Sequence, residues 1–172
     1  MFQKQIAAPS SSVNQTFFLF FLMMFFFYLG DAIMSYFAPV IMEEKLKSAA
    51  LMGVVLACSS AAGIFIDIIF ARYFSQYRSF FFTRLMFSLA FLFPISFLLG
   101  VSIFHFLFGM ISWGITYEAM MFTTYHSIHE SVSKTQHAFA WGMMAICHNL
   151  SLVLGPLIAS YTYDRSPQIT LF

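Results

Sequence analysis

Five apolar stretches, each long enough to cross a bilayer as a helix, constrain this chain more than any other feature. They cover residues 16–42, 48–71, 80–99, 101–125 and 138–161. A bilayer core about 30 Å thick needs roughly 20 apolar residues in a spanning helix. Runs of this length exclude a soluble helical protein. We therefore expect an all-α integral membrane protein, with a bundle of five transmembrane helices over residues 16–165.

The composition supports an outer face that contacts lipid. Charged residues make up 9% of the chain, whereas a soluble domain carries about 25%. So few polar groups cannot cover the surface for contact with water, and the 25 phenylalanines suit a lipid-facing surface. The net charge of +1, with scattered basic residues, argues against nucleic acid as a partner.

The distribution of lysine and arginine predicts the orientation, because these residues favour cytoplasmic loops. With the N-terminus inside, the basic residues on the cytoplasmic side are Lys4, Arg72, Arg78, Arg84 and Lys134. Those on the outer side are Lys45, Lys47 and Arg165. We expect a multi-pass protein of the cell membrane (inner or plasma), with residues 1–15 as a cytoplasmic segment.

The end of the sequence predicts a further span. After the charged turn of residues 164–167, residues 168–172 turn apolar again. Five spans would also leave the two termini on opposite sides of the membrane. We expect residues 166–172 to be the start of a truncated sixth span.

Asp31 is the sharpest functional candidate, since it lies near the middle of the first stretch. A charged side chain there costs about 2.5–3.5 kcal/mol on insertion, which calls for a reason. A carboxyl group in a cavity can bind and release a proton, and a proton-coupled carrier requires this chemistry. The alternative is a neutral Asp31 hydrogen-bonded to a neighbouring helix.

For three other polar residues inside the spans, the sequence leaves two roles possible. Glu118, in the fourth stretch, is either a site residue or one that reaches the inner interface. His148 and Asn149, near the centre of the fifth, point about 100° apart on a helix. Both cannot face lipid, so one lines a cavity or they hydrogen-bond between helices.

Small residues and prolines predict packing and bends. Ser151, Gly155 and Ala159 repeat every four residues, a stripe that lets helices approach closely. Pro156 removes one helix hydrogen bond and predicts a kink. Pro39 and Pro94 predict bends in the first and third stretches.

Several motifs resemble the major facilitator superfamily. Gly63 and Asp67, then Arg72 and Arg78, resemble its loop motif, G-x-x-x-D and a basic turn between helices two and three. Gly30-Asp31 with Pro39 resembles the G-x-D and late proline of many members. The segment 154–159 resembles the family's G-P-x-x-G segment. The resemblance covers about residues 16–165.

The resemblance implies a secondary active transporter that moves a small-molecule solute by alternating access. Such carriers bind substrate near the midplane between two six-helix halves. This chain would be most of the N-terminal half, and the missing C-terminal half would be its partner. Asp67 and Arg72 would be gate residues. Asp31 would be a coupling or substrate-binding carboxylate, for instance in proton symport. We expect no cofactor and no enzymatic activity.

Two other functions compete with transport. A membrane metalloenzyme would use the histidines and Glu130 of the loop between the fourth and fifth stretches, namely His126, His129 and His137. Their order is not H-E-x-x-H and no second histidine cluster completes a site, so we predict no metal. The other alternative is a small multi-spanning subunit or scaffold that works as an oligomer.

Overall fold

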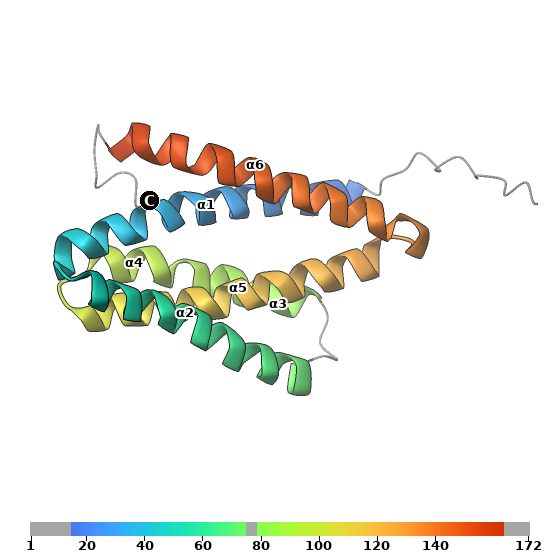
Figure 1. Cartoon of the computed structure of the whole chain (residues 1–172). Coiled ribbons are helices and arrows are strands. Elements are labelled where there is room, and N and C mark those ends of the chain that lie inside the picture. The colour runs from blue at the N-terminus through green and yellow to red at the C-terminus, as the bar shows by residue number, and fades with distance from the viewer. Residues whose placement is uncertain (1–14, 75–78, 164–172) are drawn as a thin grey trace, which may run out of the picture.

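The computed structural model describes residues 15–74 and 79–163, and these residues form a bundle of helices joined by short connections (Figure 1). The helices are α1 (Gln15–Leu46), α2 (Ala49–Ile69), α3 (Ser79–Ala90), α4 (Leu92–Leu98), α5 (Ile103–Ser131) and α6 (His137–Tyr163). A π-helical turn, η1 (Phe70–Phe74), continues α2, and a 3-10 turn, η2 (Lys134–Gln136), precedes α6. The predicted all-α bundle is confirmed.

The third apolar stretch forms two helices instead of one. Pro94 has no N–H to donate to the carbonyl of Ala90, and its ring crowds that carbonyl. The helix is accordingly interrupted at Phe91, between α3 and α4. By contrast, Pro39 and Pro156 lie inside α1 and α6, which continue through them.

Four segments of the described chain are long and apolar enough to cross a membrane. They are Phe17–Leu46, Ala49–Tyr73, Ser79–Leu98 and Lys134–Thr162. The helix α5 is not among them, although its 29 residues exceed the length that a span needs. It stays a predicted span, and so do the exact limits of the other four.

The lower apolar character of α5 follows from its central position. It packs against α2, α3 and α4, so that protein surrounds much of it. Its buried polar residues are Ser112, Thr116, Thr123, Thr124 and Ser127. The hydroxyl groups of Thr116 and Thr124 donate to carbonyls one turn back, at 2.8 and 3.0 Å. Such bonds let polar side chains lie in an interior without water.

Two layers make up the bundle. The helices α1 and α6 run side by side along most of their length, and the remaining helices pack beneath them (Figure 1). Two apolar clusters fill the interior, and α1 contributes to both: Tyr28 belongs to one and Met34 to the other. Asp31 therefore lies on α1 between the two clusters.

The outer face of the bundle is apolar, as contact with lipid requires. Large exposed side chains are spread over all the long helices, among them Phe18, Phe65, Phe80, Phe104 and Val153. Of the predicted terminal features, residues 1–14 of the N-terminal segment and the start of the sixth span lie outside the described residues.

Candidate functional site

Asp31 is the one charged residue that is buried within the described part of the chain. Its side chain is 8% exposed. Ser35, one turn further along α1, donates a hydrogen bond to its Oδ1 at 3.3 Å. Among the described residues no lysine, arginine or histidine forms an ion pair with it, so its charge is not compensated by a basic side chain. An uncompensated carboxyl inside a membrane bundle points to function.

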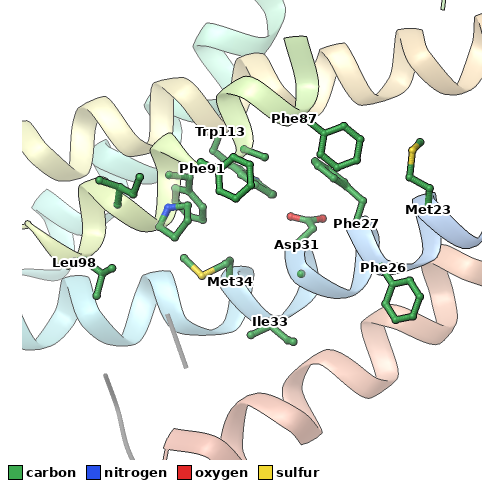
Figure 2. Close-up of a pocket in the computed structure, with 15 residues that line it drawn as sticks. Met23, Phe26, Phe27, Asp31, Ile33, Met34, Phe87, Phe91, Leu98 and Trp113 are labelled. Carbon is green, nitrogen blue, oxygen red and sulfur yellow. The ribbon is translucent and has the colours of Figure 1, made fainter. Parts of the chain in front are cut away.

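A cavity of about 590 Å³ opens beside Asp31. Residues from α1, α3, α4 and α5 line it, and Figure 2 shows the Asp31 carboxylate directed away from its helix towards the space between Phe27 and Trp113. Asp31 is the only charged residue in the lining. The volume lies in the range of pockets for small molecules.

Aromatic rings from four helices form one continuous wall of this cavity. Phe27 of α1 meets Phe87 of α3 edge to face, with ring centroids 6.1 Å apart. Phe27 also lies nearly parallel to Trp113 of α5 at 6.5 Å. Trp113 then contacts Phe93 of α4 at 4.7 Å. These contacts hold rings from separate helices around a shared space.

The interruption between α3 and α4 also lies in the lining of the cavity. Ala90, Phe91 and Pro94 all belong to the lining, and they surround the break. The helix is interrupted there because Pro94 cannot continue the hydrogen bonding of α3. The interruption at Pro94, where the sequence predicted a bend, therefore lies at the cavity beside Asp31.

Glu118 lies at a second, smaller cavity of about 360 Å³ between α2 and α5. Its carboxylate comes close to Gly63, where an added Cβ would lie 3.2 Å from Glu118 Oε1. Trp113 lines both cavities, so the two are neighbours. The structure thus brings the glycine of the loop motif together with Glu118, a pair that the sequence analysis did not connect.

The other residues of the loop motif lie apart from the Asp31 cavity. Asp67 is exposed on the same face of α2 as Gly63 and interacts electrostatically with Glu118. Arg72 is exposed in η1, with its guanidinium 5.6 Å from the centroid of the Tyr73 ring. No ion pair joins Asp67 and Arg72 within residues 15–74. Arg78 lies outside the described residues.

His148 and Asn149 take the different environments that their spacing requires. His148 is half-buried, with its ring 5.0 Å from that of Tyr28 on α1. Asn149 is exposed. Neither residue lines the Asp31 cavity.

Gly155 and Pro156 lie where α6 approaches α1. Gly155 is buried against Ala32, the residue after Asp31. Pro156 is half-buried beside it. This contact places the α6 glycine one residue from the candidate carboxylate.

The sequence analysis missed the aromatic lining. Phe27, Phe87, Phe93 and Trp113 belong to a chain so rich in aromatic residues that none stood out from those that face lipid. Their position next to Asp31 emerges only when α1, α3, α4 and α5 are brought together.

The predicted placement of the histidines and Glu130 in a loop is wrong: His126, His129 and Glu130 lie in the last turns of α5, and His137 begins α6. No group of three His, Cys, Asp or Glu in the described residues is arranged to hold a metal ion. His126 Nδ1 lies 2.9 Å from the carbonyl of Phe122, and His137 Nε2 lies 3.0 Å from that of Val132. Glu130 accepts hydrogen bonds from the hydroxyl and backbone N–H of Ser79, at 3.0 and 3.4 Å.

The fold and the Asp31 cavity define a class: a multi-pass α-helical membrane protein with a buried carboxylate beside an open, largely apolar cavity. Residues 11–171 match the family model of the Major Facilitator Superfamily. Because the match covers most of the sequence, the chain belongs to the major facilitator superfamily. This family consists of secondary transporters, which are not enzymes. No curated protein and no solved structure matches the chain.

Proposed function

We propose that this chain moves a small solute across the cell membrane by alternating access, with Asp31 as the residue that binds the proton or the solute. The observation that carries the proposal is the buried, uncompensated Asp31 carboxylate on a cavity of about 590 Å³. Family membership supports transport in general. The proposal adds the coupling to protons and the role of Asp31.

The proposed role of the proton follows from the cost of enclosing a charge. A carboxylate in apolar surroundings is far less stable than a neutral carboxyl group. Protonation of Asp31 would therefore favour a state in which the cavity is closed, and release of the proton would need contact with water. Ser35, whose hydroxyl donates to Oδ1 at 3.3 Å, would stabilise the unprotonated carboxylate.

We propose a separate gate at the end of α2. Gly63, Asp67 and Glu118 lie together at the interface of α2 and α5, and Arg72 follows in η1. In the closed state, Asp67 would accept hydrogen bonds from a second helical bundle of the carrier. Glu118 would add a second negative charge to this contact.

The proposed orientation places the N-terminus in the cytoplasm, because Lys and Arg favour cytoplasmic loops. Lys47, in the connection between α1 and α2, would then face the outside. In a background without Cys58 and Cys147, Lys47→Cys should react with a membrane-impermeant maleimide on intact cells. Labelling only after the cells are opened would reverse the orientation.

A flux assay tests the proposed function. The protein encoded by the native gene is reconstituted into liposomes that contain a pH-sensitive dye. A sugar, an amino acid, a carboxylic acid and an organic cation are then added one at a time under a proton gradient. We expect one class to change the proton flux. Asp31→Asn should abolish this change, and Asp31→Glu should keep part of it.

The matched control is Glu44→Gln, which removes an exposed carboxylate near the C-terminal end of α1. It should leave the flux unchanged. A full solute-dependent proton flux in Asp31→Asn would remove Asp31 from the mechanism. Solute movement without any proton flux would discard proton coupling while leaving alternating access.

A further inference from the structure

We infer that the Asp31 cavity selects apolar organic cations, that is, solutes in which a positive centre carries bulky hydrocarbon or aromatic groups. The inference rests on the proposed function, because it names the solute class of the same site. Three features of the cavity lead to it: its charge, its aromatic wall and its shortage of hydrogen-bonding groups.

The charge of the lining favours a cation. Asp31 is the only charged lining residue, and no basic side chain pairs with it in the described residues. A buried carboxylate without a partner is costly, and a cationic ligand would relieve that cost. An anionic solute would meet repulsion from the same group.

The aromatic wall favours a cation whose charge is poorly hydrated. Aromatic faces attract cations within about 6 Å of the ring centroid, and tryptophan does so best. Phe27, Phe87 and Trp113 present such rings next to the Asp31 carboxylate (Figure 2). An organic cation can use the carboxylate and the rings together, as a hydrated metal ion cannot.

The rest of the lining argues against sugars and other polar solutes. Apart from Asp31 and the indole N–H of Trp113, the side chains of the lining are apolar, among them Met34, Ile95 and Leu98. A neutral polar solute would lose its hydrogen bonds to water without replacement. Hydrocarbon substituents, in contrast, gain from this surface.

The same carboxylate cannot hold a proton and pair with a cation at once. The two ligands would therefore exclude each other at Asp31, and their coupling would be exchange rather than symport. Ser35 donates a hydrogen bond to Asp31, and Tyr28 on α1 and Tyr117 on α5 are near enough to interact with it electrostatically. Hydroxyls such as these stay neutral around pH 7, so they do not compensate the carboxylate.

Two ions of the same shape and opposite charge provide the test. Tetraphenylphosphonium and tetraphenylborate are each dialysed to equilibrium against the purified full chain in a non-ionic detergent, and binding to protein-free micelles is subtracted. We expect the cation to bind at least about tenfold more tightly than the anion. Asp31→Asn should weaken binding of the cation by about tenfold, and Trp113→Leu should weaken it by about threefold.

Controls separate the charge of Asp31 from the fold. Asp31→Glu should retain most of the cation binding, and Glu44→Gln should retain all of it. Circular dichroism and gel filtration show whether each variant keeps its helices and its size. If Asp31→Asn fails to fold, the comparison of Trp113→Leu with the unaltered chain decides: a loss confined to the cation supports the inference, and an equal loss of both ions overturns it.

Other occupants of the Asp31 cavity predict different results in this binding experiment. A lipid chain or another helix of the carrier would fill the cavity by apolar contact alone. Equal affinity for both ions, no measurable binding, or unchanged cation binding in Asp31→Asn would each overturn the inference. The proposed function would survive if a sugar, an amino acid or a carboxylic acid still drove Asp31-dependent proton flux. The proposed function would be overturned if the cation bound at Asp31 but no solute of any class moved in the flux assay.

Discussion

Gly155 of α6 lies against Ala32 of α1, and this contact sets how closely the two helices approach. A Cβ added to Gly155 would lie 2.5 Å from the Cβ of Ala32 and 2.9 Å from its carbonyl carbon. Small residues at such points let helix backbones meet within a membrane. Because Ala32 follows Asp31 directly, the contact also fixes the position of the candidate carboxylate.

Gly155→Ala should therefore destabilise the bundle. The new methyl group meets the backbone of α1, which cannot move aside as a flexible side chain can. We expect a loss of about 1–3 kcal/mol, as for overpacked interiors. Thermal unfolding in detergent measures it. Gly142→Ala is the matched control on the same helix, because nothing lies within 4 Å of the added Cβ. Equal stability of the two variants would contradict the close contact.

Two glycines at the contact of α2 with α5 should respond differently to the same change. An added Cβ on Gly114 meets the backbone carbonyl of Ser59, whereas on Gly63 it first meets the flexible end of Glu118. We expect Gly114→Ala to cost about 1–3 kcal/mol and Gly63→Ala less than about 1 kcal/mol. The free energies of unfolding of the two variants, measured in mixed micelles, test this order. The reverse order would show that the α2–α5 contact is not as described.

Asp67→Asn should slow transport without abolishing binding of the solute. Asp67 is exposed at the end of α2 and does not line the Asp31 cavity. Loss of its charge would weaken the proposed gate and leave the site intact. Initial rates of uptake and equilibrium binding, measured on the same preparation, separate the two effects. Unchanged rates would discard the gate, and lost binding would place Asp67 at the solute.

Glu130→Gln should loosen the start of α3. Glu130 accepts two hydrogen bonds from Ser79, the first residue of that helix, where the helix dipole favours a negative charge. Loss of the charge should lower stability by about 0.5–1 kcal/mol. The Glu44→Gln variant, which removes an exposed carboxylate elsewhere, should leave the melting temperature in detergent unchanged. An equal effect in both variants would refute the capping role.

The sequence predicts most of the fold because the bilayer imposes it. The length of an apolar run needed to span a membrane follows from the thickness of the bilayer, so the helices could be placed without knowing their contacts. Two details escaped this argument. The interruption at Phe91 depends on how the chain responds to Pro94. The low apolar character of α5 makes sense only once α5 is known to be surrounded by protein.

The candidate site could be predicted only in part. Asp31 stood out because a charge inside a span is rare. Its aromatic neighbours come from helices far apart in the sequence, and nothing local distinguishes Trp113 or Phe87 from rings that face lipid. Likewise, the approach of Gly63 to Glu118 depends on the register of α2 against α5. Such pairs are set by tertiary packing, which a single sequence does not reveal.

The interruption between α3 and α4 has a consequence for water. At Ala90 the main chain presents a carbonyl oxygen that Pro94 cannot bond, and both residues line the same cavity as Asp31. A main-chain oxygen left without its helical donor within the thickness of a bilayer must find a donor in protein, solvent or ligand. Beside the Asp31 carboxylate, this oxygen is a second acceptor in a lining whose side chains are otherwise nearly all apolar, so it does not make the cavity a site for neutral polar solutes. Any molecule that fills it has to replace whatever hydration those oxygens hold.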